Sequence, residues 1–228
     1  MALRPVFIAI DEYPYVKEEM IDFEWHKGMA VSQKQKSIGS LHKAAKEQFA
    51  HLDILEISTK SEQALGVQLS AFNLRVELKS GQKLPLENIF HASKVFENGG
   101  PYKELLSIPT HEVKRDERLL ESGKLIGFSS KGKVWPLTPQ TIFYDWLYLN
   151  TLSLQEDLIA EVRHYNAFTD IEFNPKKSIN CQARSAALFV SLTRKELLKQ
   201  FLSSSDEFIR QFSLKSTTDK PEQKDLFS

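Results

Sequence analysis

The chain has 228 residues, of which 41% are hydrophobic and 11% aromatic, and this suits one domain with a buried core, with or without appendages. Thirty basic and thirty acidic residues cancel, which argues against a DNA binder held by overall charge but leaves room for a local nucleotide or DNA-end site. The single cysteine, Cys181, excludes an internal disulfide and a cysteine-rich zinc site.

The N-terminal part of the chain is expected to supply strands around one helix. The apolar run RPVFIAI, followed by DEYPYV, predicts an extended strand and a turn. This start is too charged for a signal peptide, and no run approaches the length of a membrane helix, so we expect a soluble intracellular protein. Residues 32–49 predict a helix, LDILEIS predicts a short buried strand, and residues 67–86 predict a hairpin, or a strand and loop, that turns at Ser80-Gly81.

The segment 84–100, LPLENIFHASKVFENGG, predicts a helix with its own start and stop signals. Pro85 suits the first turn, and the run NGGP ends the helix. Further helices are predicted at 102–106, 111–121, 139–152, 154–165 and 183–201, with a polar loop between the last two. Beyond these helices polar and charged residues dominate, which predicts a flexible tail. The fold class that follows is mainly α, of the α+β type, with a small β-hairpin.

Charged residues gather on one side of the helix predicted at 84–100. Glu87, His91 and Lys94 are three and four residues apart, so they face the same way beside Phe90. Glu87 lies in the first turn, where the helix dipole stabilises its carboxylate. Together with the amide of Asn73 in the preceding segment, this set fits sugar or nucleotide chemistry. A solvated face with minor ion pairs has the same spacing, so both interpretations remain open at this point.

The order of these motifs resembles the NADAR family, also called YbiA-like proteins. That family has a strand with an S-N-F-type ending, a turn and a helix that reads roughly T-x-E-H-x-Y-Q-A-x-K-F. This chain has LSAFN, a Gly-containing turn and LPLENIFHASKVF. Glu87, Phe90 and Lys94 take the acid, aromatic and lysine positions, while His91 replaces a glutamine. The segment GFSSKGKVWPLTP supplies Trp135, where the family has an R-x-x-W-type segment.

The resemblance continues to residue 192. TDIEFN supplies Asp170, with Phe173 in place of a tryptophan and Asn174 in place of a glycine, and SINCQARSAALF supplies Asn180. Together with SQKQKSI, FENGGPY and the long N-terminal segment, these residues resemble the branch of the family that is paired with DarT-type toxins. The expected organisation is an N-terminal extension at 1–68 packed on the core, a NADAR-like catalytic core at 69–202 and a flexible tail at 203–228.

The resemblance implies a compact, mostly helical fold and an N-glycosidase that needs no cofactor or metal. For this branch it implies removal of ADP-ribose from guanine bases in DNA, by an antitoxin of the bacterial cytoplasm that opposes a DNA ADP-ribosyltransferase toxin. The expected partners are ADP-ribosylated DNA, ADP-ribose and a cognate DarT-type toxin. Two alternatives stay open, namely cleavage of small phosphoribosyl metabolites and non-catalytic binding of ADP-ribose or of the toxin.

Our hypothesis for the mechanism gives each candidate catalytic residue a role. Lys94 would attack the anomeric carbon and form a Schiff base with an opened ribose. Glu87 would move protons or stabilise the sugar cation, and Asp170 would bind a ribose hydroxyl or activate water. The structural alternatives for these three residues are a surface lysine, a helix-dipole carboxylate and a turn aspartate.

A larger set of residues is expected to bind the substrate. The aromatic members would stack on a base or pack in the core, and the polar members at 176–184 precede a helix, where a diphosphate site is expected. The candidates are Phe72, Asn73, Phe90, His91, Trp135, Phe173, Lys176, Ser178, Asn180 and Arg184.

The chain ends in QKDLFS, in which Gln223, Leu226 and Phe227 resemble a short motif that docks bacterial repair and replication proteins on the sliding clamp. A polar tail would present such a peptide with little steric conflict. The alternative is a frayed polar terminus.

Overall fold

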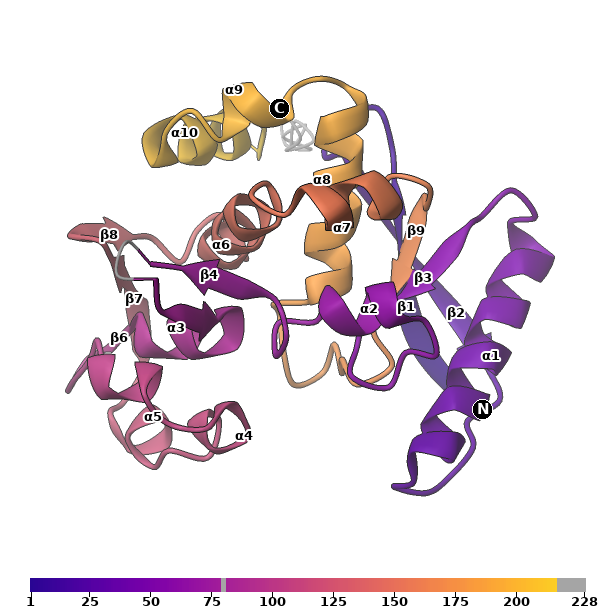
Figure 1. Ribbon diagram of the computed structural model, residues 1–228, viewed down its shortest axis with the longest axis horizontal. Coiled ribbons are helices and arrows are strands. Elements are labelled where there is room, and N and C mark those ends of the chain that lie inside the picture. The colour runs from indigo at the N-terminus through magenta and orange to yellow at the C-terminus, as the bar shows by residue number, and fades with distance from the viewer. Residues whose placement is uncertain (79–80, 217–228) are drawn as a thin grey trace, which may run out of the picture.

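The computed structural model describes residues 1–78 and 81–216 of the chain (Figure 1). Helices and small sheets are interspersed along these residues, so the expected α+β class is confirmed. No helix in the described part of the chain is long and apolar enough to cross a membrane.

The largest sheet joins segments that are far apart in the sequence. Strand β1 (Ala2–Ala9) pairs antiparallel with β2 (Val16–Phe23) and with β9 (Ala167–Thr169), and β9 pairs in parallel with β3 (Ile54–Glu56). The strand order is therefore β2-β1-β9-β3. The expected N-terminal extension supplies three of these strands, and β9 comes from the expected core.

Helices cover both faces of this sheet. Because successive side chains of a strand point to opposite faces, Val6 lies in one hydrophobic core and Phe7 in another. Helix α1 (Val31–Gln48) covers the Val6 side with Ile38, Leu41 and Ala45. The Phe7 side packs on helix α8 (Gln182–Arg194).

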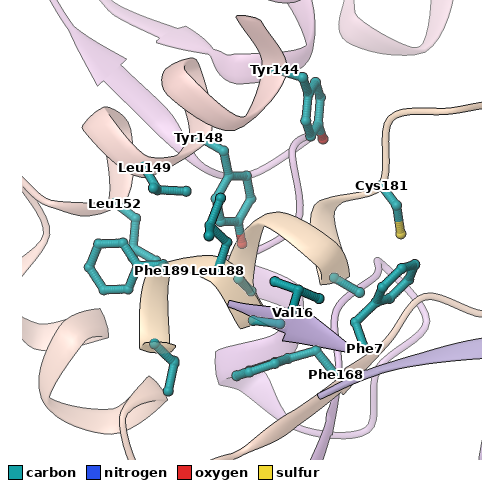
Figure 2. Close-up of a cluster of buried hydrophobic side chains, with 14 of the residues drawn as sticks. Phe7, Val16, Tyr144, Tyr148, Leu149, Leu152, Phe168, Cys181, Leu188 and Phe189 are labelled. Atoms are coloured by element: carbon teal, nitrogen blue, oxygen red, sulfur yellow. The ribbon is translucent and has the colours of Figure 1, made fainter. Parts of the chain in front are cut away.

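The larger core lies between α8, the sheet and helix α6 (Ile142–Leu152). Figure 2 shows Tyr144, Tyr148 and Leu149 of α6 on one side of this core and Phe7 and Phe168 of the sheet on the other. The hydroxyl of Tyr148 donates to the carbonyl of Leu69 at 2.9 Å, so the one polar group of this buried ring is satisfied.

The helix predicted at 84–100 is wrong in its second half. Helix α3 covers only Leu86–Ala92, and Lys94–Phe96 form strand β6. This strand pairs with β7 (Leu125–Ser130), which pairs with β8 (Lys133–Trp135). The carbonyl of Ser93 accepts a hydrogen bond from the backbone of Ser129 at 2.7 Å, so sheet pairing begins where the helix ends. Lys94 therefore projects from a strand.

The segment before α3 is also different from the prediction. Residues 69–73, expected as the end of a strand, form turns after helix α2 (Ala64–Gln68). A hairpin does follow, formed by β4 (Arg75–Glu77) and β5 (Lys83–Pro85), and its predicted turn lies partly outside the described residues.

The remaining helices are mostly shorter than predicted. The helix expected at 111–121 is split in two, and the one expected at 183–201 is split after α8. These elements are η1 (Lys103–Leu106), α4 (Thr110–Val113), α5 (Arg118–Glu121), α7 (Glu156–Val162) and α9 (Leu198–Phe201).

The tail expected from residue 203 instead begins with helix α10 (Ser205–Ser216). Phe208 of this helix is fully buried, and its ring centroid lies 5.3 Å from that of Trp146 on α6. Apolar residues among the polar ones thus hold this part of the tail on the core. The possible clamp-docking motif at 223–227 lies outside the described residues and stays a prediction.

Candidate active site

Glu87 is a buried carboxylate that contacts one cation, Lys114, and one polar ring, His91. It lies in the first turn of α3 with 4% of its surface exposed, and its backbone N–H donates to the carbonyl of Ala71 at 3.0 Å. Its Oε1 atom is 2.7 Å from Nζ of Lys114 and 3.1 Å from Nε2 of His91. Burial alone would raise the pKa of Glu87, but the hydrogen bond from His91 and the charge of Lys114 lower it to about 2.

His91 supports this carboxylate as a neutral ring. Burial lowers the pKa of His91 and outweighs the opposing hydrogen bond to Glu87, so the imidazole is uncharged at neutral pH. Because Glu87 accepts, Nε2 of His91 carries the proton. The other ring nitrogen, Nδ1, is buried and has no hydrogen-bond partner among the described residues.

Lys94 lies next to this pair with its ammonium group over an aromatic ring. Its Nζ is 5.1 Å from the centroid of Phe90. Burial and the charge of Lys114 lower the pKa of Lys94 to about 8, although the nearby Glu87 carboxylate acts in the opposite direction. A measurable fraction of Lys94 is therefore a free amine near neutral pH, which is what a lysine nucleophile needs.

Phe90 joins the charged residues to the core. Its ring packs on Phe128 at 5.4 Å and edge-on against Tyr144 at 5.0 Å. Burial raises the pKa of Tyr144, and the charges of Glu87 and Asp170 add to this effect, so the ring stays protonated and lies within electrostatic reach of both acids.

Asp170 forms the second part of the site, in the turn after β9. Its Oδ1 accepts the backbone N–H groups of Glu172 and Phe173, at 3.0 and 3.2 Å, and its Oδ2 accepts from Nε2 of Gln182 at 3.0 Å. Burial and the nearby Glu56 raise the pKa of Asp170 despite these hydrogen bonds. Asp170 therefore caps a turn, as its structural alternative predicted, and its pKa is also raised.

Glu56 at the end of β3 holds the segment that carries Asp170. It is buried, its Oε2 accepts from the hydroxyl of Thr169 at 2.6 Å, and its Oε1 accepts from the backbone of Ile171 at 2.8 Å. Nε2 of His42 on α1 lies 2.8 Å from the same Thr169 hydroxyl oxygen. Burial raises the pKa of Glu56. Sequence reasoning missed this acid because LDILEIS gives only a strand signal.

Gln182 ties the two parts of the site together. Its Oε1 accepts the backbone N–H of Ala71 at 2.7 Å, and its Nε2 donates to the carbonyl of Ile57 at 2.6 Å as well as to Asp170. The amide thus fixes the turn before α3 against the turn after β9. A single glutamine at the start of a helix gives no sequence signal for this role.

Several predicted aromatic residues lie in different environments. Phe72 is half-buried, and Nζ of Lys114 lies 5.4 Å from its ring centroid, so Phe72 stands beside the Glu87 cluster, which is Glu87, Lys94 and Lys114. Trp135 is 2% exposed and packs on Phe143 at 5.4 Å, which favours its core alternative. Phe173 is partly buried and meets Phe7 of the core edge-on at 6.2 Å.

The predicted polar residues also lie in different environments. Asn73 is exposed and donates to the carbonyl of Val67 at 3.0 Å, as a turn amide would. It also borders a surface groove of about 680 Å³ between the β4–β5 hairpin and the loop before α7. Glu87, Lys94 and Lys114 do not line this groove. Lys176 and Ser178 are exposed, and Asn180 is half-buried.

Arg184 is held by a buried acid that the sequence did not reveal. Its Nη1 pairs with Oδ2 of Asp145 and lies 3.1 Å from the hydroxyl oxygen of Thr141. Asp145 also accepts from the hydroxyls of Thr141 and Ser185, each at 2.6 Å. Among the described residues only Nη1 of Arg184 is engaged, so the rest of the guanidinium is available to an anion.

The described residues contain no group of three or more histidine, cysteine or acidic side chains that could hold a metal ion. The arrangement instead places an ionised acid, Glu87, within electrostatic reach of Lys94, whose pKa is lowered. Gln182 joins the turn before α3 to a second acid, Asp170, whose pKa is raised.

A family model described as the DarT1-associated NADAR antitoxin matches residues 2–222, which is nearly the whole chain. No curated protein matches it.

Proposed function

This chain belongs to the family of DarT1-associated NADAR antitoxins, and from this we propose that it is a hydrolase that removes ADP-ribose from guanine bases in DNA. Family membership gives the antitoxin class and its association with the toxin. The reaction and the substrate are our proposal. The observation that carries it is the cluster of buried Glu87, half-buried Lys94 and exposed Lys114, in which Lys94 has a lowered pKa.

Lys94 acts as the nucleophile in this proposal. Its free amine attacks the anomeric carbon of the ribose as the bond from that carbon to the guanine nitrogen breaks, and the guanine leaves with a proton. Opening of the ribose ring gives a Schiff base on Lys94. Water then adds to the Schiff base, supplies the oxygen of the released ADP-ribose and restores the amine.

The two acids take different parts in this reaction because their environments push their pKa values apart. Glu87, with its lowered pKa, stays a carboxylate and stabilises the positive charge that develops on the sugar. Asp170, with its raised pKa, keeps a proton at higher pH and can give it to the departing base or to a ribose hydroxyl oxygen.

Other residues of the site suit the rest of the substrate. The half-buried ring of Phe72 offers a face on which a base can stack beside Lys114. Arg184 lies in the first turn of α8 and is oriented by Asp145 of α6. Its guanidinium offers donors for the diphosphate of ADP-ribose.

The test is incubation of the protein with an oligonucleotide that carries ADP-ribose on a guanine, followed by gel and mass spectrometry. The wild type is expected to release ADP-ribose and intact DNA, and Lys94→Ala and Glu87→Ala are expected to lose at least about 100-fold of the rate. Lys103→Ala, which changes an exposed lysine of η1, is the matched control and should keep full activity.

Borohydride reduction during turnover tests the covalent step. A Schiff base would be trapped as a stable adduct whose mass is that of the protein plus the opened ADP-ribose, located on Lys94 by peptide mapping. A wild type that leaves the modified oligonucleotide untouched would refute the DNA substrate. Free phosphoribosyl compounds and simple binding of ADP-ribose would then be the next assays.

A further inference from the structure

We propose that the junction between β2 and α1 binds the DNA strand that flanks the modified guanine, through a surface centred on Trp25. This inference rests on the proposed function and adds a second contact region to it. The Trp25 surface consists of the Trp25 cluster, which is Arg4, Trp25 and Lys34, together with the exposed Lys27 and Lys36. None of these residues belongs to the Glu87 cluster.

The Trp25 cluster combines an indole ring with two cations. Cζ of Arg4 lies 5.2 Å from the ring centroid, and Nζ of Lys34 lies 4.9 Å from it. Nε of Arg4 is buried and has no partner among the described residues, which leaves one donor of the guanidinium unsatisfied. Aromatic rings beside Arg and Lys are the platforms on which proteins stack bases of a single strand without regard to sequence.

The cluster borders the part of the site that carries Asp170. Nζ of Lys34 lies 3.8 Å from Oε1 of Glu172, and the backbone N–H of Glu172 donates to Asp170 at 3.0 Å. Figure 1 shows the N-terminal end of α1 and the loop between β9 and α8 along the same lower edge of the molecule. A strand that leaves the Asp170 region can therefore continue over the cluster.

The local charge fits a polyanion. The chain as a whole is neutral, but residues 24–36 hold three lysines and one acid, and residues 171–178 hold two lysines and one acid. The lysines at 27, 36, 176 and 177 are all exposed. The diphosphate of one ADP-ribose can be met by Arg184, whereas a row of separate cations matches the regularly spaced phosphates of a DNA strand.

Binding and turnover of two substrates test this surface in the Lys27→Gln/Lys36→Gln double variant. We expect its affinity for an unmodified single-stranded oligonucleotide, measured by fluorescence anisotropy, to fall about tenfold at low salt. The slope of log affinity against log salt should decrease by about 0.7 for each lysine removed. The kcat/KM on an ADP-ribosylated oligonucleotide should fall in parallel, while that on ADP-ribosylated guanosine should not change.

The control is Lys43→Gln/Lys46→Gln, which removes the same charge from exposed positions about 10–15 Å further along α1. Equal losses in both double variants would mean that overall charge binds DNA, and this would overturn the proposal. A wild type without affinity for single strands would also overturn it, as would equal slowing on the nucleoside. Binding as expected without any cleavage would instead refute the proposed hydrolase and leave the surface standing.

Discussion

Burial is the main cause of the lowered pKa of Lys94, and the charge of Lys114, a residue 20 positions further along the chain that contacts Glu87 at 2.7 Å, lowers it further. An amine must lose its proton before it can attack, so we expect the single-turnover rate of the wild type to rise with pH until about 8, where the pKa of Lys94 lies. The rate should fall again above the raised pKa of Asp170, which is also about 8, because a proton donor is lost there, so the profile should be a narrow bell with its maximum near pH 8.

Lys114→Met should shift the rising limb of this profile. Removal of the like charge raises the pKa of Lys94, so less free amine is present at neutral pH and the rate there should fall several-fold. The charge-conserving change Lys114→Arg should restore the wild-type limb. If the limb of Lys114→Met stays in place, Lys114 does not set the protonation of the nucleophile.

Glu56 should keep its proton to a higher pH in the folded protein than in the unfolded chain. Burial raises its pKa above the ordinary value of 4.5, so the folded state binds more protons than the unfolded state as the pH rises past that value. The contribution of Glu56 to the free energy of unfolding should therefore decrease above pH 4.5, until the pH passes its raised pKa.

Glu56→Gln imitates the protonated acid, so its stability should fall less with rising pH than that of the wild type. Glu56→Ala leaves the partners at Thr169 and Ile171 without an acceptor and should lose about 1–3 kcal/mol at every pH. Urea unfolding at several pH values measures both effects. Parallel curves for wild type and Glu56→Gln would show that Glu56 titrates normally.

Sequence reasoning could name Glu87 and Lys94 because they stand in one short motif. It could not find the acids that hold Arg184 and the segment of Asp170, because those contacts join distant parts of the chain. Glu56 meets Thr169 across 113 positions, and Asp145 meets Arg184 across 39. An isolated acid in an apolar strand or helix gives no local sign of such a partner.

At the scale of elements, the segment 93–96 shows why a helix was predicted where a strand exists. Phe90, Ser93 and Phe96 continue the helical spacing of α3, but Lys94 and Phe96 also fit the two-residue period of a strand. Pairing with β7 decides between them, and that partner lies about 30 residues away. Because Lys94 lies on a strand, its side chain points in a different direction from the one that a continued helix would give it. The strand therefore helps to place the amine in the site.

Helix α10 is a second element that its amino-acid composition does not predict. Its polar residues predicted a tail, but Phe208 is fully buried against Trp146 and packs edge-on against Phe201 at 6.4 Å. Phe208→Ala should therefore lower the free energy of unfolding by about 3–5 kcal/mol, as truncation of a buried ring does. Arg210→Ala, at an exposed position of the same helix, should change it by no more than about 0.5 kcal/mol. Equal effects of the two changes in chemical denaturation would mean that α10 does not dock in solution.

At the scale of the whole molecule, the first 68 residues and the rest of the chain share one sheet. Strand β9 has only three residues, and its neighbours are β1 on one side and β3 on the other. Phe168 and Ala167 of β9 point into the two cores on opposite faces of that sheet. Loss of both neighbours would leave the backbone of β9 unpaired and expose its side chains, and Asp170 follows β9 directly.

A fragment that lacks residues 1–68 should therefore not fold, whereas the full chain should unfold in one cooperative transition. The reason is that β1 and β3 supply the backbone partners of β9, and Glu56 supplies the acceptor for the Ile171 N–H. Far-ultraviolet circular dichroism during thermal unfolding measures both expectations. Deletion of the last 12 residues, which lie outside the described part of the chain, is the control and should leave the transition in place. A cooperative transition in the fragment would show that 69–228 contains a complete core, and the N-terminal strands would then be an appendage rather than part of the fold that positions Asp170.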